Sequence, residues 1–252
     1  MDVVLPGNEP WVSARLVADA LLAAGFETYL VGGCVRDLLL DRPVKDVDLA
    51  TAAHPDQVET VFAVAGMRTI AVGKAFGVVV VVSPSGINVE VASFRNDGQY
   101  VDGRRPSAVS FSTAREDVER RDFTVNALLM DPRDGRIVDH VGGLDDLRAK
   151  KLRAVGAAAA RLREDRLRVL RAVRFAAHLG LWIERETWAA MQATDLAGLS
   201  GERLMQEWQK GLVQAPAAWV RLLGEAERLG EFCPPLAAAG SSAVGEAARS
   251  LE

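Results

Sequence analysis

Two aspartates lie one residue apart in the segment DVDLAT, residues 46–51, whose apolar residues favour a short strand. Side chains alternate between faces along a strand, so Asp46 and Asp48 point the same way. Two carboxylates held side by side repel each other, and one tends to stay protonated unless a cation lies between them. Mg²⁺ removes this repulsion and favours carboxylate oxygens together with substrate phosphate oxygens. The pattern predicts a magnesium site, although alone it also fits two acids on a solvent-exposed strand edge.

A third acid lies in the segment NVEVAS, residues 88–93, where Val89 and Val91 share one face and Glu90 lies on the other. If this segment lies beside residues 46–51, Glu90 completes a cluster of three carboxylates. Such a cluster suits nucleotidyl transfer with two metal ions, which activate the attacking hydroxyl and stabilise the leaving oxygen.

The segment YLVGGCVRD, residues 29–37, precedes the aspartates. An apolar run that ends at Gly32 and Gly33 and then continues as a helix exposes backbone N–H groups, which can bind a triphosphate. Arg36 adds a cation for the same anion. An ordinary tight turn is the simpler explanation of the glycines, but the paired aspartates that follow favour nucleotide chemistry.

These segments resemble the signature of the class II tRNA nucleotidyltransferase and poly(A) polymerase family. Further matches follow in the family's order and cover most of residues 29–181: LVGGCVRDLLLDRPVKDVDLAT, VEVASFR, DGQYVDGRRP, EDVERRDFTVNALLMDP, IVDHVGGLDDLRAKKLRAVG and REDRLRVLRAVRFAAHLGL. The resemblance implies an α+β fold, with a polymerase-β-like nucleotidyltransferase head on a small mixed sheet and an all-α neck and body.

The resemblance also assigns residues to roles. Asp46 and Asp48 are expected to bind Mg²⁺, and Glu90 to assist catalysis. The residues expected to bind the triphosphate and ribose of the nucleotide are Gly32, Gly33, Arg36, Asp37, Arg121, Asp122 and Asn126.

Residues 161–179 have the periodicity of one strong helix, on which Asp165 and Arg168 are i, i+3 neighbours. In the family that the sequence resembles, this pair selects the base. Cytosine and adenine both present an amino donor beside a ring-nitrogen acceptor, which suits a carboxylate that accepts and a guanidinium that donates. Guanine and uracil would leave buried groups unpaired. Arg171 extends the same face. An isolated pair of this kind is otherwise a surface salt bridge.

The remaining pattern predicts the elements that position these residues. A head is expected over 1–150 and a helical neck with a partial body over 151–252. We expect a helix over 11–25, a strand over 28–31, a helix that begins after a capping Thr51, a hairpin around 83–86, a loop over 95–109, a second hairpin over 130–139, and a poorly ordered end over 234–252.

The composition is that of an ordinary soluble protein, with 49% hydrophobic and 25% charged residues and a net charge of −4. No apolar segment is long enough to span a bilayer, and the first residues do not resemble a secretory signal. Cys34 and Cys233 lie far apart, which argues against a disulfide framework or a zinc site and favours a cytoplasmic protein. The arginines are clustered, so the negative net charge does not exclude nucleic-acid binding.

Among the family's activities, the sequence favours addition of the 3′-terminal CCA to tRNA from CTP and ATP. Addition of A alone and poly(A) synthesis are the alternatives, and a non-catalytic relative that binds RNA or nucleotides is an alternative of another class. The expected partners are the tRNA 3′ end and the two nucleotides, with no membrane partner and an open oligomeric state. Family members usually continue well beyond this length, so the chain is either part of a longer protein or a minimal member.

Overall fold

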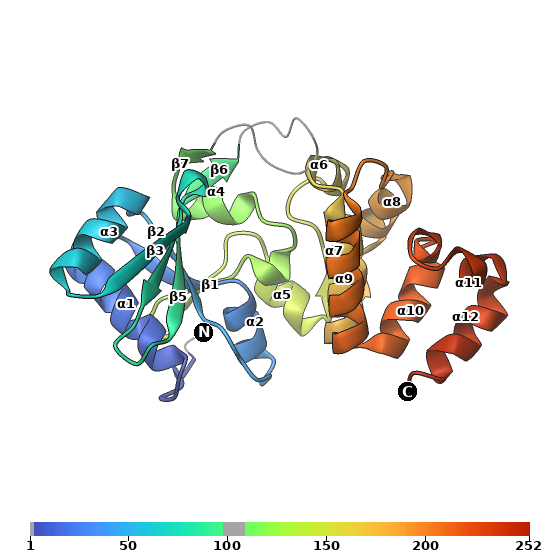
Figure 1. Cartoon of the computed structure of the whole chain (residues 1–252), viewed down its shortest axis with the longest axis horizontal. Coiled ribbons are helices and arrows are strands. Elements are labelled where there is room, and N and C mark those ends of the chain that lie inside the picture. The colour runs from blue at the N-terminus through green and yellow to red at the C-terminus, as the bar shows by residue number, and fades with distance from the viewer. Residues whose placement is uncertain (1–2, 98–108) are drawn as a thin grey trace. The chain divides into compact units, whose positions relative to one another are not determined.

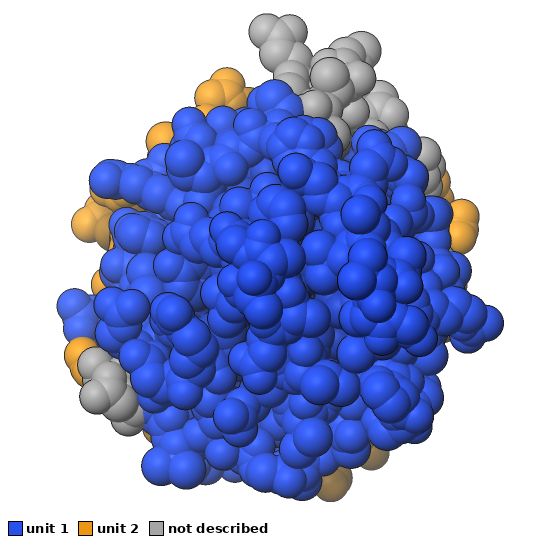
Figure 2. All heavy atoms as spheres, turned by 90° about the vertical axis from the view of Figure 1, so that its left-hand side faces the viewer, with its two compact units in different colours: residues 1–99, 106–145 blue, residues 100–105, 146–252 orange. Residues whose placement is uncertain are grey.

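A computed structural model describes residues 3–97 and 109–252. The described residues form two compact units that divide between Asp145 and Asp146, and Figure 2 colours the first unit blue and the second orange. The division falls within helix α5 (Gly143–Arg148), close to residue 150, where the sequence pattern changes.

The first unit is built on a mixed β-sheet. Within the described residues its seven strands follow the order β3-β4-β5-β2-β1-β8-β9, in which β2 and β5 are parallel and the other neighbours antiparallel. The strands are β1 (Thr28–Val31), β2 (Asp48–Thr51), β3 (Arg68–Gly73), β4 (Val78–Val82), β5 (Asn88–Ser93), β8 (Leu129–Met130) and β9 (Ile137–Val138). The mixed sheet and both predicted hairpins, β4–β5 and β8–β9, are confirmed.

Helices flank this sheet, and α1 and α3 lie together on one side of it (Figure 1). Apolar side chains at helical spacing explain this packing, because Leu21 of α1, Phe62 of α3 and Leu30 of β1 are all fully buried. The helices and 3₁₀ turns of the unit are α1 (Trp11–Ala23), α2 (Gly33–Leu39), α3 (Pro55–Val64), α4 (Ala114–Glu119), η1 (Lys74–Phe76) and η2 (Thr124–Asn126).

Two local predictions for the first unit were wrong. Thr51 does not cap the following helix: it ends strand β2, where its hydroxyl hydrogen-bonds to Thr28 and to the carbonyl of Glu27, and α3 starts only at Pro55. The ends of the predicted loop over 95–109 form an antiparallel pair, β6 (Arg95–Asp97) with β7 (Val109–Phe111). The rest of that loop, residues 98–108, lies outside the described residues.

The second unit is mainly helical. Its helices and 3₁₀ turn are α6 (Ala158–Glu164), α7 (Leu167–Leu179), α8 (Arg185–Ala193), α9 (Gly201–Gln214), α10 (Pro216–Glu225), η3 (Leu229–Glu231), α11 (Pro234–Ala238) and α12 (Gly240–Arg249). A buried ion pair joins α7 to α9, with 2.6 Å between Arg174 Nε and Glu207 Oε2. No helix in the described part of the chain is long and apolar enough to cross a membrane.

Three predictions for this unit need correction. It is not all-α, because β10 (Lys151–Leu152) pairs with β11 (Trp182–Ile183). Residues 161–179 are not one helix, because the backbone turns to an extended conformation at Asp165, with φ −138° and ψ 103°, and so separates α6 from α7. The segment 234–252, expected to be poorly ordered, contains α11 and α12.

Candidate active site

The acidic residues of the first unit lie on neighbouring strands of the sheet. Asp48 is the first residue of β2, and the buried Val47 and Leu49 alternate with the exposed Asp46 and Asp48, as the sequence pattern predicts. Leu49 lies opposite Val91 in the parallel pair β2–β5, so the residues that precede them, Asp48 and Glu90, lie on adjacent strands. The predicted pairing of these two strands is confirmed.

The carboxylates are close enough to influence one another. The pKa of Asp48 is raised to about 6, first by desolvation and then by the negative charges of Glu90 and Asp46, while the positive charge of Arg121 acts in the opposite direction. Within the described residues no ion pair neutralises Asp46, Asp48 or Glu90. The local field is therefore that of a site that attracts a cation.

The donor set fits Mg²⁺ with help from a substrate. In the described part of the chain no group of three or more acidic, histidine or cysteine side chains is arranged to hold a metal by itself. Mg²⁺ is usually bound through one or two carboxylates, with water and substrate phosphate oxygens as its other ligands. Two crowded aspartates meet that requirement, whereas a structural metal cage does not form here.

The predicted glycine turn follows β1. Gly32 has φ +80°, a conformation that favours glycine, and its amide N–H donates to the carbonyl of Leu128. A Cβ at Gly32 would lie 3.3 Å from Arg121 Nη1, and one at Gly33 would lie 3.6 Å from Arg36 Nη2. The backbone of this glycine turn therefore lies close to the guanidinium groups of Arg121 and Arg36.

A hydrogen-bonded network links the other predicted nucleotide-binding residues. The Arg36 guanidinium donates to both carboxylate oxygens of Asp37, at 2.8 and 2.9 Å, and to the side-chain oxygen of Asn126. Asn126 in turn donates to Asp122 Oδ1 over 3.2 Å, and the same oxygen accepts the Phe123 N–H. The structure therefore brings Gly32, Gly33, Arg36, Asp37, Arg121, Asp122 and Asn126 together around one turn of the first unit.

The predicted base-selecting residues lie in the second unit, but not as i, i+3 neighbours on one continuous helix. Asp165 sits at the break before α7, where its carboxylate accepts the Leu167 N–H and both of its oxygens accept from Arg203 Nη2, at 3.0 and 2.9 Å. Arg168 is buried in α7 and donates to Glu164 Oε2 over 2.7 Å and to the carbonyl of Arg161.

The third predicted member, Arg171, lies one turn further along α7, with its guanidinium carbon 5.2 Å from the ring centroid of Phe175. It therefore packs against the helix surface, where a cation over an aromatic face is weakly stabilised.

Two residues around these sites were missed by the sequence reasoning. Asp117 is buried and pairs with Arg120 and Arg121, and its i+3 and i+4 spacing to those arginines is a signal that could have found it. Arg203 lies 38 positions from Asp165, and no local pattern connects the two.

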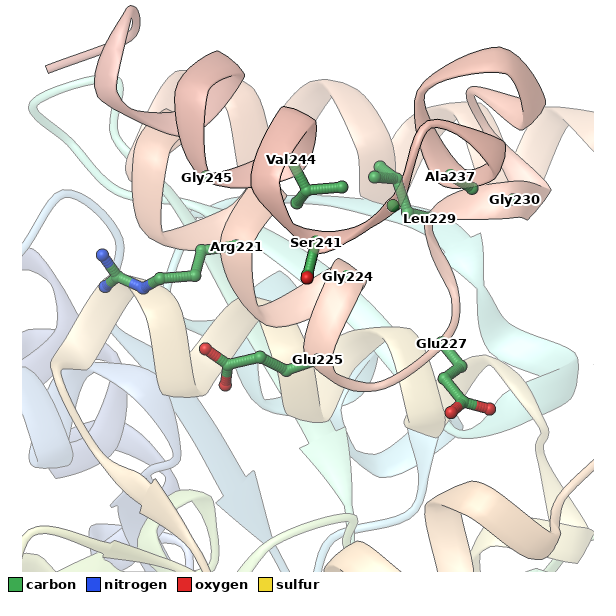
Figure 3. A pocket seen from close by; sticks show the side chains of 11 residues that line it. Arg221, Gly224, Glu225, Glu227, Leu229, Gly230, Ala237, Ser241, Val244 and Gly245 are labelled. Carbon is green, nitrogen blue, oxygen red and sulfur yellow. The ribbon is translucent and has the colours of Figure 1, made fainter.

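A cavity of about 520 Å³ in the second unit is separate from all of these residues. It lies among α10, η3, α11 and α12, and Figure 3 shows apolar Leu229, Ala237 and Val244 among the side chains that line it. None of the predicted site residues lines it.

Comparison with known proteins identifies the family. A family model described as the poly(A) polymerase head domain matches residues 28–153, which contain the acidic cluster and the glycine turn. The chain belongs to this family.

Members of the family with known names resemble the chain over most of its length. The CCA-adding enzyme of Bacillus pumilus (strain SAFR-032) is 44% identical over 206 residues, which are 81% of this chain and 50% of that protein. The structure of the Bacillus stearothermophilus CCA-adding enzyme in complex with CTP matches with a TM-score of 0.83 and 38% identity, over 96% of this chain and 58% of that one.

A structure of the Thermotoga maritima CCA-adding enzyme complexed with tRNA matches with a TM-score of 0.75 and 25% identity, over 91% of this chain and 54% of that one. The chain spans about half the length of the curated relatives it matches. The polymerase-β-like head and helical neck implied by the resemblance are thus confirmed as the fold.

Proposed function

We propose that the chain carries the catalytic head and the base-selecting neck of a nucleotidyltransferase that adds C and A to the 3′ end of tRNA without a nucleic-acid template. The observation that supports this most directly is the position of Asp46, Asp48 and Glu90 beside the glycine turn, where desolvation and then the charges of Glu90 and Asp46 raise the pKa of Asp48 to about 6. The proposal places the reaction in the cytoplasm, with CTP, ATP and the tRNA 3′ end as partners.

Asp46 and Asp48 are the residues that would hold Mg²⁺. When bound there, the metal supplies activation of the attacking 3′ hydroxyl and stabilisation of the leaving phosphate oxygen. Glu90 keeps the local field negative, and it lies on the strand beside Asp48, where it assists the pair electrostatically.

The glycine turn and its arginines would bind the nucleotide. The backbone at Gly32 and Gly33 leaves room for close approach of phosphate oxygens, and Arg121 provides positive charge beside the turn. Arg36, Asp37, Asp122 and Asn126 form a connected network that fixes the donors and acceptors available to the ribose and triphosphate.

Asp165 and Arg168 would read the Watson–Crick edge of the incoming base. Arg203 Nη2, which donates to both carboxylate oxygens, and the Leu167 N–H fix the direction in which the Asp165 carboxylate accepts. Glu164 holds the Arg168 guanidinium in the same way. A fixed acceptor and a fixed donor fit cytosine and adenine and leave guanine and uracil mispaired.

The named relatives favour CCA addition over the alternatives, since those described above are CCA-adding enzymes. An enzyme that adds A alone, or a poly(A) polymerase, would use the same acidic cluster and glycine turn. A non-catalytic relative would have no need of crowded carboxylates that attract a metal ion.

One experiment separates these possibilities. The chain is incubated with Mg²⁺ and each labelled nucleotide on tRNA that lacks its 3′ end, on tRNA ending in C, and on tRNA ending in CC. CCA addition predicts incorporation of CTP on the first two substrates and of ATP on the third, with no extension after the final A. Incorporation of ATP alone indicates an A-adding enzyme, long A tails indicate a poly(A) polymerase, and no incorporation with retained binding of both CTP and tRNA indicates a non-catalytic relative.

A further inference from the structure

Asp117 is a buried carboxylate in helix α4, with a side chain only 1% exposed. Burial alone would raise its pKa, but the charges and hydrogen bonds of Arg121 and Arg120 outweigh it and hold the pKa below the ordinary value. A buried charge is costly unless it is fully paired. The contacts of Asp117 therefore indicate which role this buried carboxylate has in the fold.

Its two oxygens serve different parts of the first unit. Oδ1 accepts from the Arg120 guanidinium, at 2.6 and 3.0 Å, and from the backbone N–H of Arg95, at 3.3 Å. Arg120 Nε also donates to the Arg95 carbonyl, so both backbone groups at the start of β6 are held. Oδ2 accepts from Arg121 Nη2 over 3.0 Å.

Arg121 connects this carboxylate to the glycine turn. Its Nη1 lies 3.3 Å from where a Cβ of Gly32 would be, and its positive charge lowers the pKa of Asp48. Its Nε is buried and has no hydrogen-bond partner among the described residues. One nitrogen is therefore fixed by Asp117, a second faces the turn, and a third is left without an acceptor.

We infer that Asp117 is a positioning residue, which holds the Arg121 guanidinium at the glycine turn and anchors it to the backbone of Arg95 at the start of β6. It acts through Arg121 and does not itself touch the nucleotide. A long arginine side chain loses much rotamer freedom when it is fixed, and a preorganised guanidinium binds phosphate without meeting that cost at the moment of binding. This inference rests on the proposed function, because it takes the triphosphate as the anion at the turn.

The test is a double-mutant cycle between Asp117→Asn and Arg121→Lys, read by calorimetric titration of CTP into the full chain. Asp117→Asn alone should weaken CTP binding about tenfold, the loss expected for a misplaced charged hydrogen bond. In the Arg121→Lys background it should cost less than twofold further, because the group that it positions has gone.

Arg115→Ala is the matched control, since Arg115 lies on the same helix and pairs with Glu119 at the surface. It should leave CTP binding unchanged. Asp117→Glu keeps the charge and should bind CTP more tightly than Asp117→Asn does. If Asp117→Asn does not fold, Asp117→Glu takes its place in the cycle.

The outcomes separate this inference from the proposed function. Equal losses from Asp117→Asn in both backgrounds, or no loss in either, would overturn the positioning role and leave the proposed function standing. If the unmodified chain does not bind CTP at all, the proposed function fails and the inference fails with it.

Discussion

In the first unit, Asp46, Asp48 and Glu90 crowd together, and among the described residues no ion pair neutralises them. In the second unit, charged side chains of the same types are paired: Asp165 with Arg203, Arg168 with Glu164 and Arg174 with Glu207. Within the part of the chain that the structure describes, the exposed carboxylates of the first region are therefore unpaired, whereas the partly buried charges of the second region are paired.

The difference indicates which region depends on a ligand. Crowded like charges raise the energy of the folded chain until a cation enters, as expected of a site that binds metal and substrate. Paired charges are already satisfied, and their hydrogen bonds fix directions in advance of any ligand. We therefore expect substitutions in the first region to act on the rate of chemistry, and substitutions in the second to act on the choice of base.

The largest expected effect comes from Asp48→Asn. Loss of a metal ligand removes several kcal/mol of transition-state stabilisation, which corresponds to a fall in incorporation of at least about a hundredfold. The same change removes like-charge repulsion, so the thermal midpoint at pH 8 should stay the same or rise. Incorporation is measured with saturating tRNA and CTP, and unfolding by calorimetry without Mg²⁺.

Asp19→Asn is a suitable control for that experiment, because Asp19 is an exposed acid on α1. It should change neither quantity. A fully active Asp48→Asn protein would contradict the assignment of this residue as a metal ligand, and a strongly destabilised one would show that Asp48 is needed for folding.

The pH dependence of the incorporation rate is a second test of Asp48. Because the pKa of Asp48 is raised to about 6, its carboxyl becomes protonated as the pH falls below 6 and can no longer bind metal. At limiting Mg²⁺ the incorporation rate should fall about tenfold per pH unit below about 6, and high Mg²⁺ should move this fall to lower pH. A rate that is flat from pH 7 to pH 5 at limiting Mg²⁺ would contradict this.

The free energy of unfolding should change in the opposite direction to the incorporation rate: it should rise as the pH falls below about 6. Below the ordinary aspartate pKa of 3.8 the group is protonated in both the folded and the unfolded chain. Between that value and about 6 the unfolded chain releases its proton first, so the contribution of Asp48 to stability falls as the pH rises. Exposure of Asp48 to solvent reduces the size of this effect, and Asp48→Asn should abolish it in metal-free unfolding experiments.

The sequence predicted the first region better than the second, for physical reasons. The shared face of Asp46 and Asp48 follows from strand alternation around Val47 and Leu49, which is a short-range pattern, whereas the position of Glu90 beside them depends on the parallel pair β2–β5 and was inferred only on the condition that the two segments are neighbours. The break at Asp165 is opposed by the helical periodicity on both of its sides, and it is held by Arg203 from a distant helix. Tertiary contacts of this kind leave no periodic signal in a sequence.

Thr51 illustrates the same limit within the first unit. Threonine before a helical pattern is a good cap signal, but here its hydroxyl is used inside the sheet by Thr28 and Glu27. The roles assigned to individual site residues, including Arg36 and Arg171, stay predictions.

The proposed base-selecting role of Asp165 and Arg168 is tested by Asp165→Asn combined with Arg168→Asp. The donor and acceptor order is then partly reversed, so incorporation of C and A should weaken and some U or G should be admitted. The cost of a mispaired buried group is about 1–3 kcal/mol, which predicts a shift in preference on the order of tenfold or more. The measurement is single-nucleotide incorporation with each of the four triphosphates.

Preference among the bases, and not total rate, is the decisive quantity here, because Asp165 also binds Arg203 and an aspartate at position 168 would face Glu164. Arg163→Asp introduces the same charge change as Arg168→Asp at an exposed position of α6 and should leave the preference unaltered. If the double variant loses activity but keeps its preference for C and A, these residues form structural ion pairs and base selection lies elsewhere.

The smallest effect on catalysis is expected from Gly211→Ala in α9, which tests whether the second region depends on packing. A Cβ at Gly211 would lie 2.4 Å from ring atoms of Trp219, a fully buried side chain whose ring packs near Trp208 and Phe232 at centroid distances of 6.4 and 6.3 Å. Overpacking of this kind costs about 1–3 kcal/mol, whereas alanine is favoured over glycine inside a helix by about 1 kcal/mol. We expect the steric overlap to outweigh the gain in helix propensity, because the enclosed indole of Trp219 has little room to move.

Gly201→Ala in the same helix is its matched control, since a Cβ there meets nothing within 4 Å. Calorimetric unfolding should show a lower midpoint for Gly211→Ala and an unchanged or higher one for Gly201→Ala. CTP binding well below the midpoint should be the same in both variants, because a Cβ at Gly211 meets the Trp219 ring and none of the residues proposed to bind the nucleotide. An unchanged midpoint for Gly211→Ala would mean that Trp219 moves aside, and a loss of CTP binding in the folded variant would mean that the nucleotide site depends on the packing of α9 against Trp219.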